Sequence, residues 1–64
     1  MALNKVKLAR MEKEITQADL AKACSVTRQT IGLIESGKYN PTISLCLSIC
    51  KVLDKTLDDL FWED

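Results

Sequence analysis

Hydrophobic positions recur at helical spacing along most of the chain, and no stretch alternates with the period of two that is typical of a strand. Apolar residues line one face of a predicted helix in residues 3–13. The same spacing returns in residues 16–24 and 27–35, and again after Pro41. The pattern therefore predicts an all-α fold of short helices with brief connections.

The central stretch, residues 16–35, is predicted to be two short helices joined by a tight turn. Thr16 can cap the first helix, with Asp19 three residues later as the acidic partner of a capping box. Three residues then fall on one inward face of this helix: Leu20, Ala21 and Cys24. Ala21 is small, as expected where two steeply crossing helices touch.

The second helix of the pair begins after another cap residue, Thr27. Ile31 and Ile34 lie three residues apart on its inner face, and Val26 precedes the cap as a hydrophobic anchor. The residues left on the outer face are Arg28, Gln29, Thr30, Gly32 and Leu33. This is the layout of a helix-turn-helix whose second helix offers a short polar face to a DNA groove.

A loop is predicted at residues 36–41, because Gly37 suits a left-handed helix end and Pro41 disfavours the helical conformation before it. Thr42 or Ser44 can cap a fourth helix. Its apolar positions are Leu45, Cys46, Ile49, Cys50 and Leu53. A fifth, shorter helix follows, with Thr56 as its cap and apolar positions Leu57, Leu60 and Phe61.

Charge is distributed unevenly, although the 64 residues carry a formal net charge of zero. Residues 1–38 hold seven Lys and Arg against four acids, a net +3, whereas residues 39–64 hold two against five, a net −3. The basic half contains the helix-turn-helix, which favours contact with nucleic acid. Within it Lys5, Lys7 and Lys13 are most simply solvated, although one of them could touch a phosphate.

Length and cysteine content indicate how many domains to expect and whether disulfides or a metal site are present. We expect one domain over residues 1–64, able to bury about 60% of its unfolded surface. Three cysteines do not make a disulfide framework. Cys46 and Cys50 could form a thiol sensor, but small core hydrophobes are the simpler interpretation. With no His, a metal site would need every cysteine and a carboxylate, so no metal and no cofactor are expected.

The N-terminus has no signal-peptide core, and no apolar run approaches the length of a membrane span, so we expect no membrane association and a cytoplasmic location. Catalysis is not expected either. The chain shows no nucleophile paired with a base and no Gly-rich phosphate loop.

The chain resembles the Cro/repressor helix-turn-helix family, the Xre-type regulators that include the lambdoid phage repressors, on the string TQADLAKACSVTRQTIGLIESGKYNP and the later LDDLFW. The resemblance runs from Val6 to Trp62 and is closest to short, free-standing members without an effector domain. It implies a compact five-helix, lambda-repressor-like domain that binds a double-stranded DNA operator. Transcription regulation, most simply repression, is the implied function, with no small-molecule ligand.

The resemblance also implies which residues contact DNA. Arg28 and Gln29 match positions that reach base edges, and their side chains can bond guanine and adenine bidentately. Leu33 could meet a thymine methyl group or be marginal packing. The residues at phosphate-contacting positions are Gln17, Thr27, Thr30, Ser36, Lys38 and Asn40.

Two structural roles follow from the same resemblance. Arg10 and Glu35 match a partly buried ion pair that ties the first helix to the end of the third. Leu60, Phe61 and Trp62 match an end that packs against its twin in a homodimer, which would set two recognition helices about 34 Å apart on a pseudo-palindromic operator. In the alternative, Phe61 completes the core and Trp62 is simply exposed.

Four residues depart from the expected chemistry. Glu14 is an unusual helix stop, and Ser25 stands at a turn position that usually holds Gly, where a positive φ would cost about 1 kcal/mol. Gly32 costs about 1 kcal/mol inside a helix, unless it allows close approach to DNA. Ser36 replaces a common Asn, which weakens that phosphate contact.

A function of another class remains open at this level. An antitoxin-like or other protein-binding module can share this fold, but it would be expected to carry a long extra segment that wraps its partner. A purely structural bundle would leave the outer face of residues 28–30 and the charge asymmetry unexplained.

Overall fold

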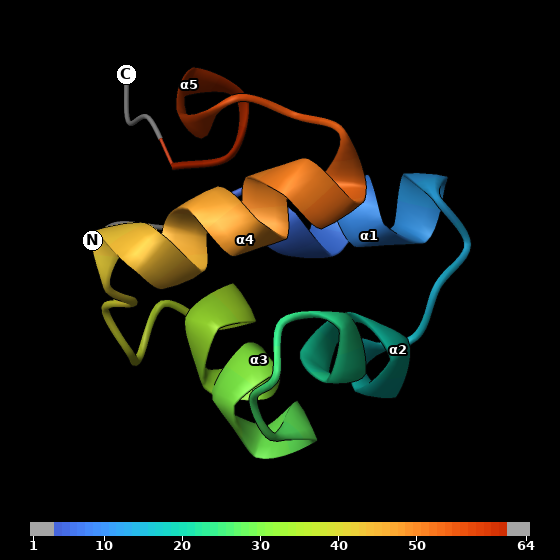
Figure 1. Ribbon diagram of the computed structural model, residues 1–64, viewed down its shortest axis with the longest axis vertical. Coiled ribbons are helices and arrows are strands. Elements are labelled where there is room, and N and C mark those ends of the chain that lie inside the picture. The colour runs from blue at the N-terminus through green and yellow to red at the C-terminus, as the bar shows by residue number, and fades with distance from the viewer. Residues whose placement is uncertain (1–3, 62–64) are drawn as a thin grey trace.

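The computed structural model describes residues 4–61 and contains five helices. They are α1 (Val6–Glu12), α2 (Gln17–Ala23), α3 (Arg28–Glu35), α4 (Ile43–Leu53) and α5 (Leu57–Phe61). No strand occurs among these described residues, so the all-α, five-helix prediction is confirmed. In Figure 1, α4 runs across α1, the α2–α3 pair lies on one side of α4, and α5 lies on the other.

Threonine side chains begin four of the five helices. The Oγ1 atoms of Thr16, Thr27 and Thr42 each accept a bond from the backbone N–H three residues later, at 3.0–3.1 Å. Thr42, not Ser44, is therefore the cap of α4. Capping boxes close at Thr16–Asp19 and Thr56–Asp59, where each aspartate accepts from the cap's own N–H at 3.0 Å. These bonds lower the pKa of both carboxyl groups.

The first helix begins later than the sequence pattern predicts. Residues 4 and 5 are not helical, and α1 begins at Val6. Asn4 Oδ1 accepts from the Val6 N–H at 3.1 Å, while its Nδ2 donates to the carbonyl of Ile34 at 2.7 Å. Asn4 therefore supports the helix start from one residue ahead of the cap position, Lys5, while its other end bonds to α3.

Left-handed residues mark the breaks between helices. Glu14, Ser25 and Gly37 have φ values of 58°, 60° and 76°, at the positions where strain or a glycine turn was predicted. Asp54, with φ 57°, ends α4 in the same conformation and was not predicted. The three non-glycine residues each carry a cost of about 1–2 kcal/mol, which the packing around them must offset.

Every helix contributes a fully buried side chain to one core. These residues are Val6, Leu20, Ile31, Ile34, Ile49, Leu53 and Leu60, each at most 1% exposed. Cys46 and Cys50 are 7% and 5% exposed and occupy the core as small apolar side chains. Burial raises the pKa of both thiols, which keeps them protonated and poorly reactive at neutral pH. The core holds α3 against α2 and α1.

Candidate nucleic-acid interface

The third helix is divided into an inner and an outer face. Ile31 and Ile34 are completely buried, whereas Arg28 and Gln29 are exposed and Leu33 is 38% exposed. Gln29 and Leu33 lie four residues apart, so they share one stripe of the outer face, with Arg28 beside it. The three predicted base-contacting residues are therefore available together on one side of α3.

An ion pair fixes the C-terminal end of α3 to α1. Arg10 Nε lies 2.7 Å from Glu35 Oε2, and Arg10 Nη2 lies 3.4 Å from Glu35 Oε1. Arg10 Nη1 also donates to the carbonyl of Ile15 at 2.8 Å. The side chains of Arg10 and Glu35 are 11% and 4% exposed, so this is the partly buried pair that the resemblance implied. Removing one partner of such a pair typically costs about 3–5 kcal/mol.

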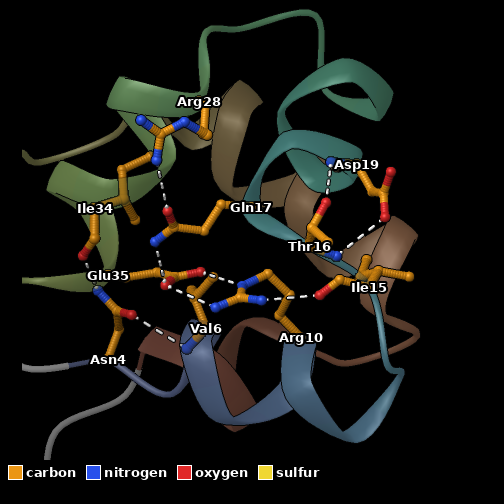
Figure 2. Close-up of polar contacts among 10 residues, drawn as sticks. All are labelled: Asn4, Val6, Arg10, Ile15, Thr16, Gln17, Asp19, Arg28, Ile34 and Glu35. Carbon is orange, nitrogen blue, oxygen red and sulfur yellow. Dashed lines mark hydrogen bonds and ion pairs between the residues drawn. The ribbon is translucent and has the colours of Figure 1, made fainter.

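Gln17 extends this ion pair to the start of α3. Its Nε2 donates to Glu35 Oε1 at 3.0 Å, and its Oε1 accepts from Arg28 Nη1 at 3.4 Å. Figure 2 shows the continuous path from Arg10 through Glu35 and Gln17 to Arg28. Both ends of the Gln17 amide have partners within the chain, a feature that helical periodicity does not reveal.

Four more residues predicted to contact phosphates lie around α3. Thr27 and Thr30 share a hydrogen bond between their hydroxyl oxygens at 2.9 Å. Ser36 Oγ donates to the carbonyl of Leu33 at 3.1 Å, and the Lys38 N–H donates to the same carbonyl at 2.9 Å. The Lys38 side chain is exposed and starts from a backbone that α3 holds in place.

Asn40 lies in different surroundings. It lines a hollow of about 210 Å³ together with Asn4, Gly37, Tyr39, Pro41, Cys46 and Phe61. Another hollow, of about 250 Å³, adjoins the polar path and is lined by Lys7, Gln17, Gly32, Glu35 and Ser36. Lys7 thus joins the candidate interface from α1. The only sequence signal for Lys7 was its position in the basic half of the chain.

The three residues predicted at a dimer interface separate in the structure. Leu60 is 1% exposed and lies in the hydrophobic core of the single chain, so it offers no surface that a second copy could contact. Phe61 is half-buried against that core, and Trp62 lies outside the described residues. Two exposed apolar residues on α4 were not predicted: Ile43 and Leu47, which are 68% and 52% exposed. Their spacing of four residues was the available signal.

Residues 4–61 show neither a metal-binding cluster nor a membrane-spanning helix. No group of three His, Cys, Asp or Glu side chains there is arranged to hold a metal ion. None of the described helices combines the length and the apolar character needed to cross a membrane.

Comparison with known proteins gives consistent matches over nearly the whole chain. A family model described as helix-turn-helix matches residues 6–60. The chain is 42% identical over 59 residues to YgzD of Bacillus subtilis, an uncharacterized HTH-type transcriptional regulator, covering 92% of this chain and 89% of that protein. An uncharacterized HTH-type transcriptional regulator of Methanocaldococcus jannaschii is 45% identical over 62 residues, covering 95% and 94%.

A solved structure shows the same arrangement of helices. The restriction-modification controller protein C.AhdI from Aeromonas hydrophila superposes with a TM-score of 0.82 at 26% sequence identity. The match covers 89% of this chain and 86% of that protein.

Proposed function

The chain belongs to the helix-turn-helix family of DNA-binding transcription regulators, and from this premise we propose that it is a homodimeric repressor that reads a pseudo-palindromic operator through α3. The family consists of regulators and not of enzymes. The observation that carries the proposal is the outer face of α3, where Arg28, Gln29 and Leu33 are exposed over a fully buried inner face.

Base readout follows from the chemistry of these three side chains. In the major groove a guanidinium can bond the O6 and N7 atoms of guanine, and an amide can bond the N6 and N7 atoms of adenine. Leu33 would place apolar surface one turn after Gln29, where the methyl group of a thymine can contact it. Arg28 and Gln29 lie in the first turn of α3, the end that contacts base edges in helix-turn-helix proteins.

Phosphate contacts would fix the position of α3 on the duplex. We assign this role to Gln17, Thr27, Thr30, Ser36, Lys38 and Asn40, as the resemblance implies. Lys38 has the clearest chemistry, because its exposed ammonium group extends from a backbone bonded to the Leu33 carbonyl. Such contacts add affinity for any sequence and release counterions.

A second copy of the chain would supply the other half-site. Ile43 and Leu47 expose apolar surface on α4, and we call these two residues the α4 stripe. Phe61 of α5 lines a hollow together with Cys46 of α4. A twofold contact through the α4 stripe and Phe61 would bury this surface and orient two α3 helices toward successive major grooves. Occupation of a promoter by such a dimer in the cytoplasm would exclude polymerase, without a ligand or cofactor.

The proposal is tested by titrating duplex DNA with the protein at several salt concentrations. Lys38→Ala should weaken binding to every duplex and reduce the slope of log affinity against log salt by about 0.9. Lys51→Ala is the matched control, because Lys51 is exposed on α4, outside the helix-turn-helix. No duplex binding by the unmodified protein, or equal effects of the two substitutions, would contradict the proposal.

A further inference from the structure

Glu35 lies within the proposed interface but has no surface of its own with which to reach DNA. Its side chain is only 4% exposed, at the last turn of α3. Its two carboxylate oxygens accept from Arg10 Nε at 2.7 Å, Arg10 Nη2 at 3.4 Å and Gln17 Nε2 at 3.0 Å. Any influence of Glu35 on DNA binding must therefore pass through one of these two neighbours.

The Gln17 amide is held between a group that only accepts and a group that only donates. A carboxylate has no N–H or O–H to offer, so the NH₂ end of the amide turns toward Glu35. The oxygen end is then left facing Arg28, whose guanidinium has only donors. A flipped amide would set oxygen against the carboxylate and NH₂ against the guanidinium, and both contacts would be repulsive. The two neighbours therefore select one amide orientation.

We propose that Glu35 is a positioning residue for base readout, because it orients the Gln17 amide and the amide oxygen in turn restricts the Arg28 side chain. This inference rests on the proposed function. It assigns to Gln17 a part in specificity, in addition to the phosphate contact that the resemblance implies. Arg10 completes the arrangement, because its charge and two N–H groups hold the Glu35 carboxylate in place.

The effect on Arg28 is a bias and not a lock. The Arg28 Nη1···Gln17 Oε1 distance of 3.4 Å is long for a hydrogen bond, and Arg28 is exposed. The guanidinium has five N–H donors, so several remain for a base while one contacts Gln17. Restricting a long side chain before binding reduces the conformational entropy that it loses when it meets the base.

The test compares discrimination between DNA sites and not affinity alone. The unmodified protein is titrated against its best selected duplex and against versions of that duplex with each base pair replaced. Arg28→Ala identifies the base pair that Arg28 reads. At that base pair, the preference of about 5- to 150-fold for the original over the replaced base pair should be lost. Gln17→Met keeps the length of the side chain but removes both polar contacts. It should reduce discrimination about two- to tenfold at that same position only.

A double substitution separates the positioning role from a phosphate contact. If Gln17 acts through Arg28, adding Gln17→Met to Arg28→Ala causes no further change in discrimination at that position. If Gln17 only contacts a phosphate, Gln17→Met weakens binding to all duplexes by the same factor, with and without Arg28, and the inference is overturned. A protein that shows no discrimination before substitution would instead refute the proposed function itself.

The role of Glu35 is tested with Glu35→Gln, whose amide can present either end to Gln17. Discrimination at the Arg28 position should fall as it does in Gln17→Met, in protein whose circular dichroism shows that it is folded. Glu12→Gln is the matched control, because Glu12 forms an exposed pair with Lys55 at 3.5 Å on the surface. Unchanged discrimination in folded Glu35→Gln would show that Glu35 is structural only. If Glu35→Gln does not fold, the result of Gln17→Met decides the inference.

Discussion

Several of the polar side chains expected to meet DNA already have partners within the chain. Thr27 caps α3 and contacts Thr30, and Gln17 joins Glu35 to Arg28. A hydroxyl or amide engaged in this way can still accept or donate one further bond, but its position is set by the fold. Interfaces built from such supported side chains lose less entropy on binding, which favours specific over adaptable recognition.

Arg28→Ala tests the assignment of base readout to a single side chain. The substitution should cost about 1–3 kcal/mol of binding free energy at the best site and relax specificity at one base position in each half-site. The measurement is a set of titrations against single-base variants of that site, with Lys38→Ala in parallel. If both variants weaken all sites uniformly, the division into base contacts and phosphate contacts is wrong.

Single residues were predictable wherever local chemistry decides their state. Gly37 and the threonine caps follow from rules that involve only neighbours in sequence. Asp54 could not be foreseen as a left-handed residue, since aspartate is also common in other turn conformations. The burial of Leu60 depends on where α5 packs against α1 and α4, which no local pattern states.

At the scale of elements, helical periodicity and capping were enough to place all five helices in order. The bounds were less predictable, as the late start of α1 shows. That start depends on the bond between Asn4 and the carbonyl of Ile34, thirty residues away in sequence. The polar path from Arg10 to Arg28 was predicted only in its first step, because Gln17 meets Glu35 through tertiary packing.

Gly32 provides a direct measure of the stability of the recognition helix. A Cβ at this position would lie 3.8 Å from Gln17 Nε2, an ordinary contact, so the structure can accept a larger residue. Gly32→Ala should therefore raise the free energy of unfolding by about 0.5–1 kcal/mol in a denaturant titration. Gly37→Ala is the contrasting variant and should lower it by about 1–2 kcal/mol, because Gly37 has a φ of 76°. If Gly32→Ala instead lowered the free energy of unfolding, the ordinary 3.8 Å contact at this position would be contradicted.

The sequence combines a basic half, residues 1–38, that carries the helix-turn-helix with an acidic half, residues 39–64, that carries α4 and α5. This division along the sequence favours contact between the basic half and a polyanion even though the net charge is zero. The sequence pattern showed which residues share a helix face, but not that the face of Ile43 and Leu47 points to solvent.

The proposed dimer predicts that the α4 stripe is required for self-association. Leu47→Lys replaces a residue that is 52% exposed, so the monomer should remain folded while the twofold contact is lost. Sedimentation at micromolar concentration should then show dimers of the unmodified protein and monomers of this variant. Met11→Lys, at a residue of α1 that is 57% exposed, is the matched control and should remain dimeric. If all three proteins are monomers, or all three are dimers, the proposed interface is wrong.

Whether a pair of α3 helices reads a specific site in double-stranded DNA can be measured by selecting binding sites from random duplexes. We expect an enriched palindrome whose half-sites lie about 10 base pairs apart, since two twofold-related helices enter successive major grooves. A weak, asymmetric or absent consensus would contradict this expectation. That result would indicate that the fold serves a protein partner.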